Sequence, residues 1–348
     1  MNFNFKKVFL TGSSGWLGKQ LLVSLLNQQS KWVNFEHKVQ IYCLLDNEIS
    51  KEDKELFNAV NVVYGDIRVK EDCKKFLKEC DSYSLLVHAA GVIHPKDIKD
   101  FQDVNVKGSK NIIDASLKKS IAKIITISSN SPYGFNKDNI PFNEESSFNP
   151  YMAYGKSKME MEVFMHDKMS SNTNISILCV PWFYGRGMPE RQIEFYNMII
   201  KGIFPRIGKG TNIRSVVNVE NIIQGIMLCA SSSKSKNQKY WIADEKNLSM
   251  NEIVETIRDV FEKEFSITTK KPIFILPNIV SQVAGLADYL LQKLGFYNQK
   301  IHVLSEMNKN IFCDISKAKS EIGYKPEYSL YKGTFEAYED YLNKNNHA

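Results

Sequence analysis

The stretch Val8-Phe9-Leu10-Thr11-Gly12-Ser13-Ser14-Gly15-Trp16-Leu17-Gly18 decides the fold of this chain. Its apolar start predicts a short strand, and the leucines after Gly18 recur at helical spacing up to Leu26. Between strand and helix, Gly12 allows a tight turn, Gly15 lets backbone amides approach a pyrophosphate, and Gly18 lets the helix pack closely. The N-terminus of the helix then faces the phosphate charge. We therefore expect a dinucleotide site formed by Gly12, Ser14, Gly15, Trp16, Leu17 and Gly18.

Strands and helices alternate over the residues that follow. Apolar runs predict strands at 39–45, 60–64, 84–88, 121–127 and 175–180, and helical patterns lie between most of them. This alternation predicts an α/β fold with a Rossmann-type, doubly wound parallel sheet. We expect residues 1–180, joined by about 215–230, to form the dinucleotide-binding domain. Residues 181–348 are expected to form mainly a smaller, interleaved C-terminal α/β region that binds substrate.

Polar and small residues fall at the carboxyl ends of several predicted strands, where ligands bind in such sheets. Asp46 ends the second strand, where a carboxylate accepts hydrogen bonds from both ribose hydroxyls and repels a 2′-phosphate, so it favours NAD over NADP. The alternative is a turn-initiating Asp, since Asp46 lies farther after Gly18 than usual. His88 and His94 are interpreted as structural. The other candidate cofactor-binding residues are Asp66, Ile67, Ala89, Ala90, Gly91, Asn105 and Pro181.

Tyr154 and Lys158 stand one turn apart on a predicted helix, so an ammonium group can lie close to a phenol. A free tyrosine has a pKa near ~10 and is a poor base at neutral pH. A nearby positive charge favours the phenolate, which would make Tyr154 a usable acid/base. The alternative is a solvated helix face in a Lys-rich chain.

The composition excludes several classes of protein. The 348 residues are 43% hydrophobic and 24% charged, which is ordinary for a globular protein. The net charge of +6 is spread without a basic block, so we expect no nucleic-acid partner. Six scattered cysteines without a Cys-x-x-Cys pair or a His cluster indicate neither disulfides nor a metal site, and they fit a cytoplasmic location. We expect no signal sequence, because Lys6-Lys7 leads directly into the first predicted strand and the glycine turn. We expect no membrane span, because no uninterrupted apolar run reaches ~18 residues.

The arginines cluster in a chain that otherwise uses lysine. Four of the six fall within one stretch, and their planar guanidinium groups suit bidentate binding of phosphate. Surface salt bridges are the alternative interpretation. The candidate substrate-binding residues are Ser131, Tyr184, Arg186, Arg191, Arg206 and Arg214.

Taken together, these segments resemble the extended short-chain dehydrogenase/reductase superfamily, and within it the NAD-dependent epimerase/dehydratase and 3β-hydroxysteroid-dehydrogenase-like branches. The resemblance covers nearly the whole chain. It is carried by the glycine motif, Asp46, His88-Ala89-Ala90-Gly91, Asn105-Val106-Lys107-Gly108, Ser128-Ser129-Asn130-Ser131-Pro132-Tyr133-Gly134, the pair Tyr154 and Lys158, and the C-terminal segment 314–326.

The resemblance implies roles for the central residues. Tyr154 would be the acid/base, Lys158 would hold the ribose of NAD and lower the tyrosine pKa, and Ser129 would hydrogen-bond the reacting hydroxyl, with Ser128 as the second choice. Tyr154 would take the proton of a secondary alcohol as hydride leaves the same carbon for NAD. An epimerase returns the hydride to the other face of the ketone, whereas a dehydrogenase releases the ketone. Relatives often dimerise, so a homodimer through helices near 105–117 and 151–169 is expected.

The resemblance also indicates a small-molecule substrate. Arg214-Ser215-Val216-Val217-Asn218-Val219 is similar to the segment whose arginine contacts the diphosphate in nucleotide-sugar epimerases, although Ser215 replaces the usual Asp. The leading hypothesis is therefore an NAD-dependent epimerase or oxidoreductase acting on a nucleotide-activated sugar.

Other functions stay open. The Arg-x-Gly-Asp element of many sugar epimerases is replaced by residues 310–314. The predicted helix 279–294 is apolar, and in this it resembles the hydroxysteroid-dehydrogenase-like branch, whose enzymes act on apolar alcohols. One buried face of a packed helix is the alternative interpretation of that segment. A dehydratase is disfavoured because Asn130-Ser131 stand where those enzymes have an Asp-Glu pair. A non-catalytic dinucleotide-binding protein is disfavoured because Ser129, Tyr154 and Lys158 are all present.

Overall fold

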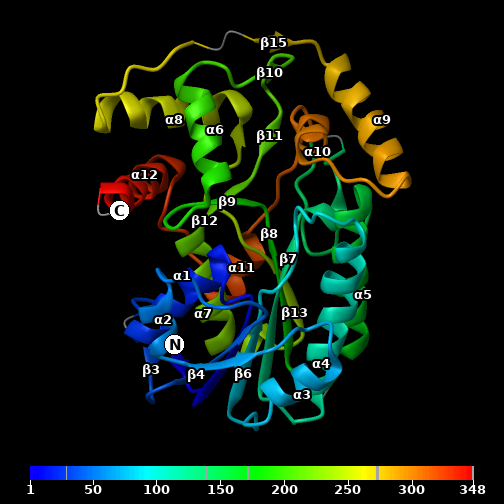
Figure 1. The fold of residues 1–348 in the computed structure, drawn as a ribbon, viewed down its shortest axis with the longest axis vertical. Helices are drawn as coiled ribbons and strands as arrows, with labels where there is room; N and C mark the ends of the chain where they lie inside the picture. The colour runs from blue at the N-terminus through cyan, green and yellow to red at the C-terminus, as the bar shows by residue number, and fades with distance from the viewer. Residues whose placement is uncertain (29, 138, 171, 272–273, 347–348) are drawn as a thin grey trace.

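A seven-stranded parallel sheet forms the centre of the molecule in the computed structural model, which describes residues 1–28, 30–137, 139–170, 172–271 and 274–346 (Figure 1). The strand order is β13-β8-β7-β6-β2-β4-β5. The chain order therefore reverses between β2 and β6, and ligands bind at such a switch point in doubly wound sheets. The strands are β2 (Lys7–Thr11), β4 (Gln40–Leu45), β5 (Asn61–Tyr64), β6 (Ser84–His88), β7 (Lys123–Ser129), β8 (Ile175–Val180) and β13 (Gln238–Trp241).

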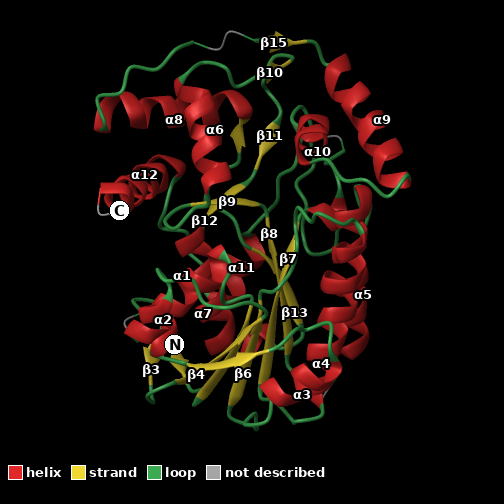
Figure 2. Ribbon diagram, in the orientation of Figure 1, coloured by secondary structure: helices red, strands yellow, loops and turns green. Residues whose placement is uncertain are grey.

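Helices cover both faces of this sheet (Figure 2). One face carries α1 and α7, and the other carries α3, α4 and α5. The bounds are α1 (Trp16–Asn27), α2 (Lys54–Asn58), α3 (Lys70–Phe76), the π-helix η1 (Phe101–Gly108), α4 (Ser109–Leu117), the 3₁₀ turn η2 (Ser131–Tyr133), α5 (Met152–Lys168), α7 (Val219–Ser231), the 3₁₀ turn η3 (Ser233–Ser235) and α11 (Ser316–Ile322). A small parallel pair, β1 (Asn2–Phe3) and β3 (Asn34–Phe35), lies beside the sheet.

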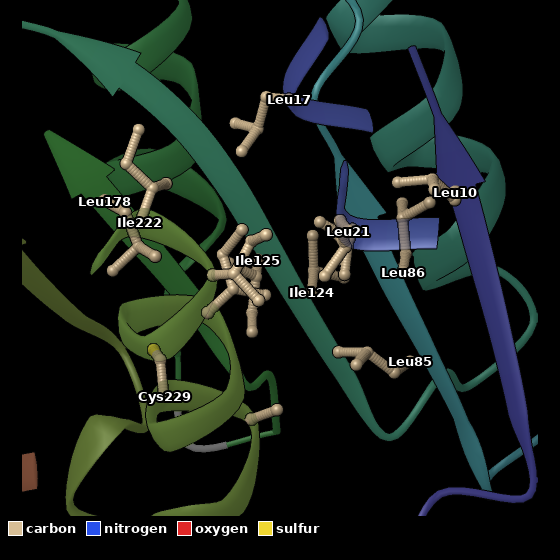
Figure 3. Close-up of a cluster of buried hydrophobic side chains, with 14 of the residues drawn as sticks. Leu10, Leu17, Leu21, Leu85, Leu86, Ile124, Ile125, Leu178, Ile222 and Cys229 are labelled. Carbon is tan, nitrogen blue, oxygen red and sulfur yellow. The ribbon is translucent and has the colours of Figure 1, made fainter. Parts of the chain in front are cut away.

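The main core lies between the sheet and its helices. Every residue of β6 and of β8 is buried, as expected for parallel strands covered on both faces. Figure 3 shows how Leu21 of α1 and Ile222 of α7 approach the strand residues Ile124 and Ile125. Burial of these aliphatic side chains is the main free-energy gain that fixes the positions of the strand ends.

The rest of the chain forms short strand pairs and helices next to the carboxyl ends of the strands (Figure 1). A second core lies there, with Tyr196, Ile257 and Phe261 at its centre. Helix α8 begins at a capping box between Ser249 and Glu252. The elements are β9 (Trp182–Tyr184) with β12 (Val216–Asn218), β10 (Arg206–Ile207) with β15 (Ile275–Leu276), β11 (Ile213–Arg214) with β14 (Leu248–Ser249), and the helices α6 (Glu190–Ile200), α8 (Met250–Glu264), α9 (Ile279–Lys293), α10 (Gln299–Glu306) and α12 (Leu330–Asn346).

The predicted fold class is confirmed: the chain has an α/β, Rossmann-type, doubly wound parallel sheet. One strand was not assigned to that sheet beforehand. β13 comes after α7 and adds to the edge of β8, with Trp241 opposite Cys179. Among the described residues, none of the helices has both the length and the apolar character needed to cross a bilayer.

Candidate active site

The glycine turn after β2 is packed too closely for side chains at two of its positions. Gly12 has φ +74°, and a Cβ on it would lie 2.6 Å from the backbone nitrogen of Ala90. A Cβ on Gly18 would lie 2.0 Å from the Gly12 carbonyl oxygen. Both glycines are therefore required by the local geometry, because the atoms they would meet belong to the backbone.

The start of α1 is suited to bind phosphate. Gly15 caps the helix without a side-chain hydrogen bond, and the first turn contains no acidic residue. Ser14 and Gly15 are exposed, so a diphosphate can approach the free amides of that turn. The adjoining side chains have structural contacts: Leu17 lies in the core, and Trp16 packs at a tilted angle against Phe183 with ring centroids 4.5 Å apart.

Two aspartates at strand ends differ in their surroundings. Asp46 is exposed directly after β4, and in the described part of the chain it has no hydrogen bond or ion pair, so its carboxylate is free to bind ribose hydroxyls. Asp66 is paired with Arg68, 2.6 Å away. Burial raises the pKa of Asp66, but the hydrogen bonds from Arg68 outweigh this effect and leave the pKa below its usual value. The neighbouring Ile67 is buried.

Buried hydrogen bonds fix the loop after β6. Ala89 donates its backbone N–H to the Thr11 carbonyl (3.2 Å), which holds Ala89, Ala90 and Gly91 beside the glycine turn. Asn105 of η1 bonds both backbone groups of Val92, and its amide donates to the Ser157 hydroxyl at 3.0 Å. The Asn105 side chain therefore joins this loop to α5.

Both histidines considered in the sequence have protein partners. The two ring nitrogens of His88 contact the hydroxyls of Thr11 and Ser109 at 2.7 and 2.8 Å. Burial, with a smaller effect of the Lys158 charge, lowers the His88 pKa to about 3, so this ring is neutral. His94 contacts the Tyr297 hydroxyl at 2.6 Å, and burial lowers its pKa to about 4.

Tyr154 and Ser129 lie together at the carboxyl end of β7. Ser129 is only 8% exposed, and its hydroxyl lies close enough to the Tyr154 phenol to lower the pKa of that phenol. Ser128 points the other way, as alternation along a strand requires, and donates to the carboxylate of Glu162. The structure thus separates the two serines, and Ser129 is the one that can share a substrate hydroxyl with Tyr154.

Lys158 is buried on α5, but its ammonium group does not contact the phenol. It donates to the Ile127 carbonyl at 2.7 Å and lies near the Met161 sulfur. Burial lowers the Lys158 pKa to about 8, and the charge of Glu162 opposes that shift. Lys158 is therefore held beside β7, with its ammonium group against the Ile127 carbonyl.

The expected lowering of the Tyr154 pKa is not found in this structure. Burial raises the pKa to about 12, the Ser129 hydrogen bond opposes this, and the charge of Glu306 adds a smaller rise. Tyr154 is thus a protonated phenol at neutral pH, ready to donate a proton. Residues four apart share a helix face, but the long Lys158 side chain reaches the Ile127 carbonyl instead of Tyr154.

Arg214 is a predicted substrate residue that contacts the end of α10. Its guanidinium donates to the Glu306 carbonyl at 2.5 Å, and its Nε is buried without a partner among the described residues. The charge of Glu306 also acts on Tyr154. Burial lowers the Arg214 pKa. A buried guanidinium with an unused donor is costly unless a ligand pairs with it.

The other predicted substrate residues do not gather around Arg214. Arg186 is half-exposed and forms an ion pair with Glu336 (3.3 Å). Arg191 is exposed on α6. Arg206 lines a separate cavity of about 330 Å³ between β10 and α8. The bidentate cluster expected from the four arginines is therefore not assembled by the described contacts.

Three further candidates have mainly backbone or core roles. Tyr184 is buried, and its hydroxyl donates to Asp244 at 2.5 Å, so the side chain belongs to the core. Ser131 accepts the N–H of Tyr151 at its carbonyl and lies near Ser129. Pro181 is buried between β8 and β9.

The sequence analysis missed the contribution of α9 and α10. Gln292 accepts the backbone N–H of Ala153 (3.0 Å), and the Tyr151 hydroxyl contacts the Ser305 hydroxyl (2.8 Å), so both helices are bound to the start of α5. Tyr297 packs edge-on against Phe101 of η1. Nothing in the local sequence indicates these long-range contacts. The effect of Glu162 on Lys158, in contrast, could be predicted from the sequence, because residues four apart in a helix are neighbours.

Comparison with known proteins identifies the family of this chain. The family described as the NAD dependent epimerase/dehydratase family matches residues 8–243. An uncharacterized protein, y4nL of Sinorhizobium fredii, is 38% identical over 96% of this chain and 94% of its own length. A UDP-glucose 4-epimerase of Vibrio cholerae is 26% identical over 98% of this chain and 97% of its own length.

Solved structures show the same fold. The dTDP-glucose 4,6-dehydratase DesIV of Streptomyces venezuelae, solved with NAD and TYD bound, superposes with a TM-score of 0.75 at 19% identity, covering 98% of each chain. The glycine turn, the exposed Asp46 and Ser129 lie at the carboxyl ends of strands, where ligands bind in doubly wound sheets. The chain is a member of the NAD-dependent epimerase/dehydratase family, within the extended short-chain dehydrogenase/reductase superfamily.

Proposed function

We propose that this protein is an NAD-dependent epimerase that inverts a secondary hydroxyl of a nucleotide-activated sugar. The observation that carries the proposal is that the charge of Glu306 acts on Tyr154, which lies close to Ser129, while the Glu306 carbonyl holds the guanidinium of Arg214. The Ser129 hydroxyl and the Tyr154 phenol could bind and deprotonate a sugar hydroxyl, and the Arg214 guanidinium could bind a diphosphate.

In this proposal each residue has a limited task. Ser129 accepts or donates a hydrogen bond to the sugar hydroxyl, and Tyr154 exchanges the hydroxyl proton. Bound NAD would accept hydride from the same carbon and return it, and its positively charged ring would favour the phenolate of Tyr154. Lys158 would orient the ribose of NAD, and the amides at the start of α1 would hold the diphosphate of NAD.

The preference for NAD over NADP rests on Asp46. Its carboxylate is exposed and free at the end of β4, where it would bind the adenosine ribose. A 2′-phosphate placed there would meet a negative charge.

The apolar-alcohol alternative loses the feature that suggested it. Val283, Leu286 and Leu290 of α9 point to solvent, with exposed fractions of 60%, 62% and 50%. The buried positions of α9 are Ser281, Ala284 and Asp288, so the side of the helix nearer α5 offers little apolar surface to a steroid-like substrate. The dehydratase alternative still lacks its acid pair, because Asn130 and Ser131 follow Ser129.

Arg214→Ala tests the proposed substrate class. We expect affinity for UDP or a UDP-sugar to fall by about 10- to 100-fold, because a charge-assisted hydrogen bond to phosphate contributes roughly 1.5–3 kcal/mol. Titration calorimetry of the purified protein measures this loss. Arg258→Ala is the matched control and should leave the affinity unchanged, because Arg258 of α8 already contacts Glu255 of the same helix and Thr269 after it. If the parent protein binds no UDP, dTDP or GDP ligand, the nucleotide-sugar proposal is wrong.

A further inference from the structure

Helix α9 is built with its apolar side outward. Ile279, Val283, Leu286 and Leu290 recur at helical spacing along one side, and each is at least 50% exposed. The residues that α9 buries are Ser281, Ala284 and Asp288. An ordinary surface helix has the opposite arrangement, so the outer side of α9 lacks the partner that its apolar residues would normally have.

The exposed apolar residues continue beyond α9. Aromatic and aliphatic side chains before and after the helix are exposed as well, and Figure 1 shows α9 at the periphery of the molecule. A soluble monomer rarely exposes so many large apolar residues in one segment. We call this set the α9 surface: Phe274, Ile275, Ile279, Val283, Leu286, Tyr289, Leu290, Leu294 and Phe296.

The charges of the same segment have one sign. Between residues 266 and 305 the sequence contains four lysines and a single acid, Asp288. All four lysines are exposed, whereas Asp288 is fully buried and contacts His302 at 2.7 Å. The segment therefore presents apolar side chains and positive charge to solvent, and no acidic side chain of its own. The lysines are Lys270, Lys271, Lys293 and Lys300.

The inner side of α9 is held in place by polar contacts. The Ser281 hydroxyl donates to the Ser305 carbonyl at 2.6 Å, and Asp288 contacts both His302 and Gln292. These buried hydrogen bonds fix the rotation of α9 against α10. The outward direction of the apolar side chains is therefore set by the polar partners on the other side of the helix.

We propose that the α9 surface docks on an anionic lipid bilayer, with α9 lying in the plane of the interface. An interfacial helix combines an apolar face that enters the acyl boundary with lysines that contact anionic headgroups. The exposed Lys293 of α9 and Lys300 of α10 match that charge, because each basic residue near such a surface is attracted by the negative potential of the headgroups.

Docking in this way would place the candidate active site close to the bilayer. Gln292 of α9 holds the N–H of Ala153, and Ala153 is the residue before Tyr154. Only the thickness of α9 would then separate the headgroup layer from the start of α5. The proposal concerns the surface itself and does not depend on the identity of the sugar.

Flotation of the purified full-length protein with lipid vesicles tests this proposal. We expect it to bind vesicles of phosphatidylcholine with about one third phosphatidylglycerol, to bind pure phosphatidylcholine more weakly, and to be released by high salt. The triple variant Val283→Gln, Leu286→Gln, Leu290→Gln should lower the bound fraction by about tenfold or more. The variant Lys293→Glu, Lys300→Glu should weaken binding to the anionic vesicles only.

A matched control replaces exposed apolar residues elsewhere, with Val23→Gln, Val69→Gln and Ile140→Gln, and should bind like the parent. Thermal unfolding of each variant shows whether it is folded. Failure of the parent to bind anionic vesicles would overturn the proposal, as would full binding by the folded triple variant. Sedimentation velocity tests the alternative that the α9 surface is a contact between copies of this chain. That alternative is correct if the parent does not bind vesicles and the triple variant has a different oligomeric state from the parent.

Discussion

Replacing Tyr154 by Phe should lower the turnover number by about 10²- to 10⁴-fold, the range that a positioned acid/base contributes. The phenol lies close enough to the Ser129 hydroxyl for that hydroxyl to lower its pKa. The ring itself packs near Phe101, with centroids 5.8 Å apart, and phenylalanine keeps that contact. We therefore expect the variant to fold and to bind NAD as the parent does, while its steady-state rate falls.

Tyr151→Phe is the matched control for this experiment. Tyr151 lies three residues earlier, and its hydroxyl contacts Ser305 of α10. Its loss removes one hydrogen bond that positions α10, so the rate should change by less than about tenfold. Equal losses in the two variants would show that Tyr154 acts only by supporting the structure, and an unchanged rate in Tyr154→Phe would remove it from the mechanism.

Gly18→Ala should abolish measurable NAD binding and destabilise the protein by about 1–3 kcal/mol, the usual cost of forcing an extra methyl group into a packed site. The new Cβ would lie 2.0 Å from the Gly12 carbonyl oxygen and 2.7 Å from the Ser13 Cα. Both neighbours are backbone atoms, so the turn itself must move. The amides at the start of α1 would then no longer be aligned for the diphosphate.

Gly285→Ala provides the control for this change. A Cβ at Gly285 would lie 3.5 Å from the nearest atom, an ordinary contact, and alanine favours a helix over glycine by up to ~1 kcal/mol. Thermal unfolding with and without NAD measures both quantities. NAD-dependent stabilisation should disappear in Gly18→Ala and persist in Gly285→Ala, and its persistence in Gly18→Ala would contradict the assigned role of the turn.

The sheet could be predicted because its signals are local. Each strand is a short apolar run, and the glycine turn has a geometry that side chains would block, as Gly12 and Gly18 show. Helix α8 was also foreseeable, since Ser249 and Glu252 form its capping box within four residues. β13 was not placed in the sheet because its pairing with β8 joins residues 62 positions apart, for example Gln238 and Ser176.

The site was predictable only in part, because side-chain direction depends on distant partners. The helical spacing of Tyr154 and Lys158 was read correctly, but the bond from Lys158 to Ile127 could not be seen in the sequence. Tyr184 resembled a substrate contact until its hydroxyl was found on Asp244, 60 residues later. Arg206 and Arg214 are close in sequence, yet they lie in different surroundings.

Helix α9 shows a limit of periodicity as a signal. Its apolar stripe is regular, and a regular stripe usually indicates the buried side of a helix. Here Asp288 and Ser281 have stronger reasons to be buried, because each finds hydrogen-bond partners on α10. The sequence pattern shows that a helix has an apolar side and a polar side, but it does not show which side packs against the rest of the chain.

The central claim is that Tyr154 and Ser129 serve a hydride-transfer epimerase for diphosphate-activated sugars. The most direct test is to incubate the purified protein and NAD with a panel of UDP- and dTDP-hexoses in deuterated water, and to record proton NMR spectra of the sugars. We expect an epimerised sugar that retains its original hydrogen on the inverted carbon, since the hydride is removed and returned without exchange with water. Deuterium at that carbon, or no inversion of any of these sugars, would contradict it.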